Sequence, residues 1–150
     1  MVGGEEGAPA VTVVADSGAL YALYDKRDDH HQAIVDAFAA VAGPVVVPSA
    51  LLSEVDYLLH RFLGIDAELD FLRSLDDGAF LLEPFTEADV SRVCELVERY
   101  RDLDIGLADA AVVATAERLH TRTLLTVDQR HFRALRHRDG SAFVLWPADR

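Results

Sequence analysis

The sequence lacks the means to form an internal disulfide, because it contains a single cysteine, Cys94. That residue belongs to an apolar pattern with Val90, Val93 and Val97, in which we expect a free cysteine to be a small buried hydrophobe rather than a reactive thiol. A chain of 150 residues can bury enough surface as one domain without cross-links. The absence of disulfides indicates a reducing, cytoplasmic setting as the default.

Long apolar runs are also missing. The longest charge-free stretch, residues 37–52, contains Gly43-Pro44 and Pro48, which interrupt a helix well before the ~20 apolar residues that a membrane span needs. Residues 1–10 have two acids, two adjacent glycines and no basic start before an apolar run, which is unlike a signal peptide. We therefore expect residues 1–10 to be a flexible tail, residues 11–150 to form one domain, and no membrane partner.

Basic residues are scarce, with a formal net charge of -12 and Lys26 as the only lysine. Such a balance argues against a nucleic-acid partner, because phosphate binding depends on Lys and Arg. The distribution of the charges along the chain, however, favours a phosphate-binding partner. Residues 1–117 contain 23 acids and 7 bases, whereas residues 118–138 contain six arginines and one acid. The sequence therefore predicts a basic strip beside an acidic pocket, compatible with a phosphate-bearing ligand, although any single arginine is more simply a solvated surface residue.

Short apolar runs alternate with helical patterns along the chain, which is typical of a parallel sheet covered by helices on both faces. The predicted strands are residues 12–15, 45–47, 80–82, 123–127 and 142–145. Three helices are predicted from their end signals. The first begins at Asp28-Asp29 and ends at Gly43-Pro44, and the second begins with Ser49 as its cap and ends at Gly64. The third begins with a capping box formed by Thr86 and Asp89. The fold class is therefore α/β.

Three aspartates follow predicted strands or begin helical patterns: Asp16, Asp109 and Asp128. Ligands of open parallel sheets bind beyond the carboxyl ends of the strands, so these residues can converge there and hold a metal ion. Each also has a simpler interpretation, as a helix cap for Asp16 and Asp128 and as a first-turn residue for Asp109. Asp109 is the most informative, because it is the only charge in residues 105–116, and a buried carboxylate must be paired, hydrogen-bonded or metal-bound.

A fourth acid comes from the helix predicted to follow Ser49. Glu54 falls on one border of the apolar stripe of that helix and Asp56 falls on the other. Helical periodicity alone therefore does not choose between these two residues.

Four segments in fixed order resemble the PIN-domain ribonucleases of the VapC toxin type. They are VVADSGAL (residues 13–20), VPSALLSEVDYLL (47–59), YRDLDIGLADA (100–110) and LLTVDQRHF (124–132). The resemblance runs from about residue 12 to residue 147. It implies a three-layer α/β/α domain with a mostly parallel sheet. It also implies a homodimer and a Mg²⁺-dependent or Mn²⁺-dependent endoribonuclease, the toxin of a type II pair that a VapB-type antitoxin holds inactive.

The resemblance also implies roles for individual residues. The catalytic and metal-binding acids would be Asp16, Glu54, Asp109 and Asp128, which selects Glu54 over Asp56 by analogy. Ser17 and Thr126 resemble hydroxyls that orient the acids, and Asp102 resembles an auxiliary carboxylate on the rim. Where the family usually has a less charged residue, this chain has Asp104, either as an exposed helix flank or as a modifier of metal affinity.

Hard carboxylate ligands suit Mg²⁺ or Mn²⁺ rather than zinc, and the six histidines do not form a zinc-ligating set. We expect the aspartates to hold one or two ions and Glu54 to position a water or a second ion, so that water attacks the RNA phosphate. The expected products have 5′-phosphate and 3′-hydroxyl ends. The arginines expected to contact RNA phosphates are Arg118, Arg122, Arg130 and Arg133.

Three other functions are weaker interpretations. A phospho-receiver module needs a lysine at the end of a late strand, but Lys26 is the only lysine. A haloacid-dehalogenase-type phosphatase needs a second aspartate two residues after the first, where this chain has Gly18. The third alternative is a PIN fold without catalysis that serves as a protein-binding module, and the presence of all four acids argues against it.

Overall fold

A five-stranded, fully parallel sheet forms the centre of the computed structural model, which describes residues 11–150. The strand order is β3-β2-β1-β4-β5. The strands are β1 (Val13–Ala15), β2 (Val45–Pro48), β3 (Phe80–Glu83), β4 (Thr123–Leu125) and β5 (Val144–Trp146). All five predicted strands are confirmed. The tail predicted for residues 1–10 lies outside the described residues.

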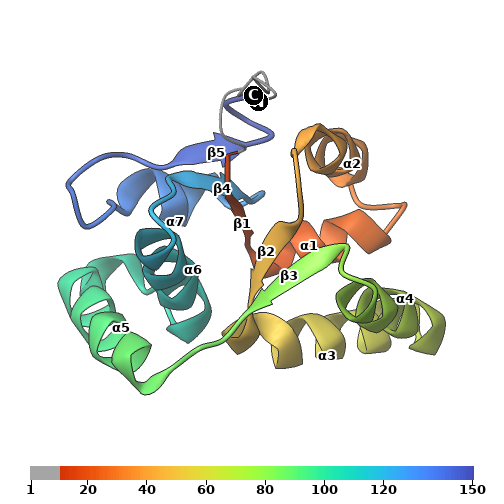
Figure 1. Cartoon of the computed structure of the whole chain (residues 1–150), viewed down its shortest axis with the longest axis horizontal. Coiled ribbons are helices and arrows are strands. Elements are labelled where there is room, and N and C mark those ends of the chain that lie inside the picture. Colours follow the sequence, from red (N-terminus) through yellow and green to blue (C-terminus); the bar gives the residue numbers. More distant parts are fainter. Residues whose placement is uncertain (1–10) are drawn as a thin grey trace, which may run out of the picture.

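Helices cover both faces of the sheet, which confirms the three-layer α/β/α architecture. They are α1 (Ser17–Tyr24), α2 (His31–Ala40), α3 (Leu52–Leu63), α4 (Ile65–Asp76), α5 (Glu87–Arg99), α6 (Leu107–Arg118) and α7 (Gln129–Ala134), with short 3₁₀ turns η1 (Ser49–Leu51) and η2 (Arg101–Leu103). Figure 1 shows α5, α6 and α7 on the left of the sheet and α1, α2 and α4 on the right. None of the described helices, of which the 13-residue α5 is the longest, has the length and apolar composition needed to cross a membrane.

The core lies along the three inner strands and helix α6. Every residue of β1 and β2 is buried, as are all three of β4. In α6 the residues from Ala110 to Glu117 are all buried, and four of them are alanines, whose small side chains let this helix pack closely on β1 and β2. The close packing of α6 fixes the place of its first turn, which carries Asp109.

Strand β4 ends two residues earlier than the sequence pattern predicts, at Leu125 rather than Val127. Thr126 and Val127 therefore leave the ladder, and Thr126 turns its hydroxyl toward the end of β1. The last strand is also shifted, because residues 142 and 143 precede β5 rather than belong to it.

The helix predicted between Asp28-Asp29 and Gly43-Pro44 is confirmed as α2, which is shorter at both ends (His31–Ala40). Of the other three helix-end signals, two are confirmed. The capping box of Thr86 and Asp89 begins α5 as predicted, and Gly64, with φ of 93°, ends α3. The cap predicted at Ser49 is wrong. The hydroxyl of Ser49 instead accepts a hydrogen bond from the main-chain N–H of Phe85 (2.8 Å), and a 3₁₀ turn leads into α3.

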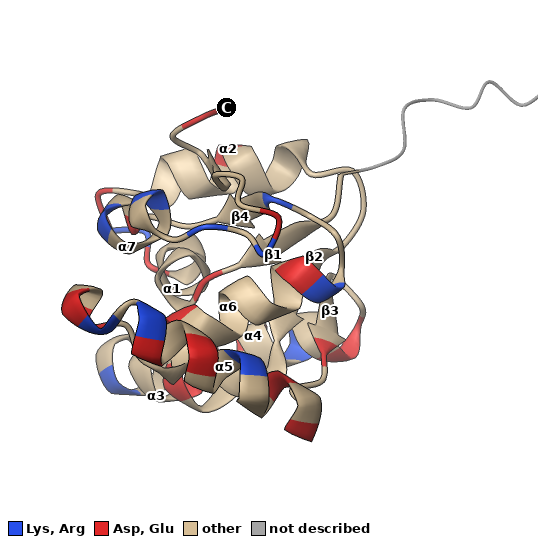
Figure 2. Cartoon of the chain, turned by 90° about the vertical axis from the view of Figure 1, so that its left-hand side faces the viewer, with Lys and Arg blue, Asp and Glu red and all other residues tan. Residues whose placement is uncertain are grey.

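The expectation that Cys94 is buried is also wrong. Helix α5 packs on α6, and its buried apolar residues are Val93 and Leu96. The other side of its apolar stripe is open, so Cys94 is exposed together with Val90 and Val97. Figure 2 shows α5 at the front of the molecule with both charges along its length.

Candidate metal centre

Asp16 lies directly after the central strand β1 and is 5% exposed. Its Oδ1 accepts the main-chain N–H of Ser17 (2.8 Å), which caps α1, and its Oδ2 accepts the hydroxyl of Thr126 (3.1 Å). Asp16 is therefore the cap of α1, and its role as a site residue stays a prediction. The contact from Ser17 is made by its main chain, whereas Thr126 uses its hydroxyl.

Asp109 and Asp128 lie at the beginnings of two helices. Asp109 is in the first turn of α6, and Asp128 is the N-cap of α7, where its Oδ1 accepts the main-chain N–H of His131 (3.0 Å). The main-chain N–H of Asp128 also donates to the hydroxyl of Thr126 (3.0 Å). Helix N-termini favour negative charge, so both positions suit a carboxylate and a bound cation can still face it. The simple interpretations, Asp128 as a cap and Asp109 as a first-turn residue, are confirmed, and the metal-binding roles of both acids stay predictions.

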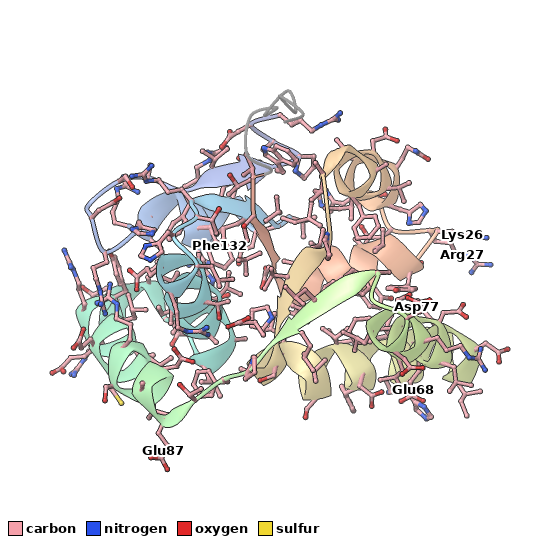
Figure 3. The ribbon with its side chains drawn as sticks, viewed as in Figure 1. Lys26, Arg27, Glu68, Asp77, Glu87 and Phe132 are labelled. Atoms are coloured by element: carbon pink, nitrogen blue, oxygen red, sulfur yellow. The ribbon has the colours of Figure 1, made fainter. Side chains whose placement is uncertain are left out.

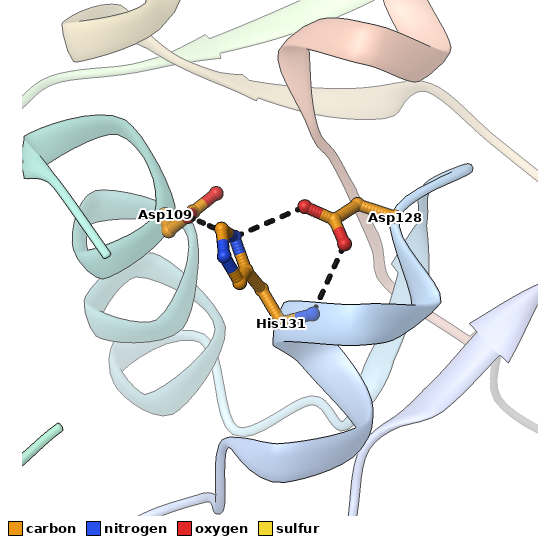
Figure 4. Close-up of side chains that lie close together, drawn as sticks. All are labelled: Asp109, Asp128 and His131. Carbon is orange, nitrogen blue, oxygen red and sulfur yellow. Dashed lines mark hydrogen bonds and ion pairs between the residues drawn. The ribbon is translucent and has the colours of Figure 1, made fainter. Parts of the chain in front are cut away.

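His131 joins these two acids, a contact that the sequence reasoning missed. Its Nδ1 lies 2.8 Å from Oδ2 of Asp109 and 3.1 Å from Oδ2 of Asp128 (Figure 4). One ligand atom from each of the three residues lies within 4.8 Å of the others. The nitrogen is buried and forms no hydrogen bond of acceptable angle with any of the described residues. Its two contacts with the carboxylates are therefore short, but neither is a well-aligned hydrogen bond.

The sequence contains one signal for His131, its spacing of three residues from Asp128. At the start of a helix this spacing puts both side chains on one face. The contact with Asp109 has no such signal, because it depends on how α6 and α7 pack.

The electrostatics of the site call for a cation. Burial, followed by the charges of Asp109 and Asp128, raises the pKa of Asp16 to about 7. Burial also raises the pKa of Asp109; the contact with His131 acts against this rise, and the neighbouring charges of Asp128 and Glu54 act with it. The charges of Asp109 and Asp128 thus act on Asp16, and mutual repulsion disfavours the ionisation of all three carboxylates without positive charge between them. Together with the buried, undirected nitrogen of His131, this donor set fits a divalent metal ion.

Glu54 is exposed in the first turn of α3, and its charge acts on Asp109. The competing candidate Asp56 is engaged elsewhere, because a hydrogen bond with Glu68 of α4 raises the pKa of Asp56. The choice of Glu54 over Asp56, which the resemblance implies, stays a prediction.

Two further acids on the approach to α6 lie apart from the Asp109–Asp128–His131 contact. Asp102 is exposed in η2. Asp104 is exposed at the end of that turn with φ of 57°, a left-handed conformation that Asp tolerates better than most residues. The proposed auxiliary role of Asp102 stays a prediction.

Three of the four arginines expected to contact RNA are paired with acids of this chain. Arg118 pairs with Glu83 and Asp89, Arg122 pairs with Asp139, and Arg133 pairs with Asp149. Arg130 has no ion pair within residues 11–150. Figure 2 shows Lys and Arg positions around α7.

Phe132 anchors the helix that carries His131. Its ring is fully buried, and Figure 3 shows it pointing into the interior from α7. The same view places Lys26 and Arg27 at the opposite side of the molecule. The only lysine therefore lies away from Phe132 and does not follow a late strand, which disfavours the phospho-receiver interpretation.

Comparisons with known proteins point to one family. The family model of the PIN domain matches residues 13–137. Ribonuclease VapC26 of Mycobacterium tuberculosis is 39% identical over 135 residues, which cover 90% of this chain and 100% of that protein. The solved structure of M. tuberculosis VapC20, described as a sarcin-ricin loop cleaving toxin, has a TM-score of 0.74 at 19% identity and covers 79% of this chain and 91% of its own. A toxin-antitoxin complex from Klebsiella pneumoniae has a TM-score of 0.66 at 18% identity, with coverages of 83% and 92%.

Proposed function

The chain belongs to the PIN-domain family of VapC-type ribonucleases, and we propose that it cleaves RNA with a divalent metal ion held by Asp16, Asp109 and Asp128. The observation that carries this proposal is the convergence of the three carboxylates. They come from the end of β1, the first turn of α6 and the cap of α7, and burial and mutual repulsion raise the pKa of Asp16 to about 7.

Carboxylate oxygens suit Mg²⁺ or Mn²⁺. When bound, such an ion supplies a Lewis acid for the phosphate and lowers the pKa of a water molecule. Thr126 fixes one oxygen of Asp16 and the main chain of Ser17 fixes the other, so this ligand is held in one orientation before metal arrives. Preorganised ligands of this kind need no rearrangement during the reaction.

Glu54 is the acid best placed to act on the attacking water, because it is exposed and near Asp109. Because water is the attacking group, the reaction does not require a side-chain nucleophile. Attack by water at phosphorus with the ribose 3′-oxygen as the leaving group leaves 5′-phosphate and 3′-hydroxyl ends, whereas attack by the ribose 2′-hydroxyl expels the 5′-oxygen and would leave a cyclic phosphate.

The proposal extends to partners. The similarity to VapC26 supports the role of a toxin in a type II pair, with a VapB-type antitoxin as the inhibitor and a homodimer as the assembly. The fold is shared with a toxin-antitoxin complex, which is consistent with an antitoxin partner. The cytoplasmic setting inferred from the single cysteine stays a prediction. A silent protein-binding module remains the alternative, but such a protein would have no reason to gather three carboxylates at a cost in repulsion.

The test is RNA cleavage with sequencing of the ends. Wild-type protein incubated with total RNA and Mg²⁺ or Mn²⁺ should leave 5′-phosphate and 3′-hydroxyl ends, and chelation by EDTA should stop the reaction. Asp109→Asn should abolish cleavage while its circular dichroism spectrum and thermal unfolding stay close to those of the wild type. A matched control is Asp70→Asn, on the exposed face of α4, which should cleave normally. Undiminished cleavage by Asp109→Asn, or cyclic phosphate ends, would refute the proposal.

A further inference from the structure

We propose that His131 is a direct ligand of the metal ion, and that its imidazole nitrogen makes the site prefer first-row transition-metal dications to Mg²⁺. The inference rests on the proposed function, since it concerns the same metal site. It adds a nitrogen ligand to the set of carboxylate ligands that the sequence predicts.

The first support is the spacing of the donor atoms. Neighbouring ligands of an octahedral ion with bonds of 2.0–2.1 Å lie about 2.9 Å apart. Nδ1 of His131 lies 2.8 Å from Oδ2 of Asp109 and 3.1 Å from Oδ2 of Asp128. The nitrogen therefore already lies at the separation of an adjacent ligand from both oxygens (Figure 4), and one ligand atom from each of the three residues lies within 4.8 Å of the others.

The second support is the unsatisfied nitrogen. Nδ1 of His131 is buried from solvent and lacks hydrogen-bond geometry to any described residue, although two carboxylate oxygens lie within 3.1 Å. Buried polar atoms are almost always satisfied. A cation between the nitrogen and the two oxygens satisfies all three at once, whereas a single N–H can point at only one oxygen.

The third support is the rigidity of the helix that presents the ring. Asp128 accepts the main-chain N–H of His131, and the next residue, Phe132, is fully buried together with Leu135. Arg133 on the same helix makes a two-pronged contact with Asp149 (2.6 and 2.7 Å). The backbone of α7 is thus held from both sides, which fixes the point from which the imidazole extends toward the two acids.

Ligand chemistry links the nitrogen to metal preference. Mg²⁺ takes oxygen ligands almost exclusively, whereas imidazole suits transition metals, and the affinity of such sites rises from Mn²⁺ through Co²⁺. A set of two carboxylates and one imidazole should therefore discriminate against Mg²⁺ more strongly than the carboxylates alone.

A different role for His131 gives the opposite result. If a protonated imidazole served only as an internal counter-ion for Asp109 and Asp128, it would compete with metal ions. Its removal would then raise the affinity for Mg²⁺ and Mn²⁺ alike. If it is a ligand, its removal lowers the affinity for Mn²⁺ and leaves that for Mg²⁺ little changed.

The experiment measures metal binding to the full chain without RNA. Pulsed electron paramagnetic resonance of bound Mn²⁺ should show hyperfine coupling to an imidazole nitrogen. His131→Asn should lose that coupling, and its preference for Mn²⁺ over Mg²⁺, from direct titration and competition, should fall by at least ~10-fold. The control His60→Asn, on the exposed end of α3, should keep both.

Each contrary outcome is informative. Bound Mn²⁺ without nitrogen coupling in the wild type would overturn this inference, and so would an unchanged preference or a parallel rise in both affinities in His131→Asn. These results would leave the metal-dependent nuclease intact. Failure of the wild type to bind Mn²⁺ at all would instead count against the proposed function itself. The wild-type measurement needs no variant, so it decides the question even if His131→Asn is unstable.

Discussion

The hydroxyl of Thr126 donates a hydrogen bond to the buried carboxylate of Asp16 across 3.1 Å, although the two residues are 110 positions apart in the chain. The parallel pairing of β1 with β4 brings them together. The same hydroxyl accepts the main-chain N–H of Asp128. One threonine therefore fixes the orientation of one acid and the position of another.

Removal of that hydroxyl should weaken metal binding. Thr126→Val keeps the shape but leaves Asp16 without one of its two hydrogen bonds, so we expect the affinity for Mn²⁺ to fall by about 10–100-fold, as for other residues that orient metal ligands. Thr126→Ser keeps the hydroxyl and should stay close to the wild type. Calorimetric titration of both variants gives the comparison. Wild-type affinity in Thr126→Val would show that the contact does not orient the ligand.

The stability of the metal-free protein should fall as the pH rises. Burial first, and the charges of Asp109 and Asp128 after it, raise the pKa of Asp16 from 3.8 to about 7. For an acid whose pKa is raised on folding, the stabilisation is fully present below the unfolded value and is lost as the pH rises toward the folded value. In EDTA we therefore expect the free energy of unfolding to drop by about 2 kcal/mol between roughly pH 5 and pH 7.

Urea unfolding at several pH values measures this effect. Asp16→Asn, which cannot ionise at that position, should remove most of the slope, and excess Mn²⁺ should offset it in the wild type because the cation replaces the proton. An equal slope in Asp16→Asn would assign the effect to other groups.

The ion pair between Arg92 of α5 and Glu117 of α6 should be important for stability. Two hydrogen bonds of 2.8 Å join the side chains, which are only 14% and 5% exposed. Glu117→Ala leaves a largely buried guanidinium without its partner, and we expect a loss of about 3–5 kcal/mol in the free energy of unfolding. Glu95→Ala removes the exposed partner of the same arginine and should cost less than about 1 kcal/mol. Equal losses in urea unfolding would contradict this ranking.

Two of the arginines expected to contact RNA, Arg130 and Arg118, should respond differently to substitution. Arg130 has no acidic partner in the described part of the chain, so Arg130→Gln should weaken RNA binding and reduce the salt slope of the affinity by about one unit. Arg118 is occupied by Glu83 and Asp89. Arg118→Gln should therefore lower the thermal stability more than the RNA affinity. Fluorescence anisotropy over a salt series, in the Asp109→Asn background to prevent cleavage, measures both. An unchanged salt slope in Arg130→Gln would show that Arg130 does not contact RNA phosphates.

The sheet and much of the candidate site could be predicted because both depend on local patterns. Five short apolar runs became five strands, and Asp16 and Asp128 lie just beyond strand ends, where a parallel sheet gathers residues. The helices of residues 17–24 and 65–76 were not predicted. In the second of these, Phe71 is the only fully buried residue, so its apolar stripe is short and its helical period is weak.

What the sequence could not provide depends on how helices pack. Cys94 and Val93 are neighbours in one apolar pattern, but the angle at which α5 meets α6 buries only Val93. The contact of His131 with Asp109 joins α7 to α6, and no spacing in the chain encodes it. Ser49 had a suitable cap sequence, yet its hydroxyl was taken by the distant main chain of Phe85, which illustrates how tertiary contacts override local preference.

The central strand of this sheet is the first to be synthesised, and β4, its neighbour on one side, is made after most of the chain. A ribosome translating the message therefore carries a polypeptide without a complete nuclease pocket through most of elongation. A chain that ends before Thr123 already contains Asp16 and Asp109, but it lacks β4, α7 and the residues Thr126, Asp128 and His131 that follow β4. Prematurely terminated products that stop before Thr123 would be harmless to the RNA of the cell that makes them, and damage can begin only with almost full-length protein.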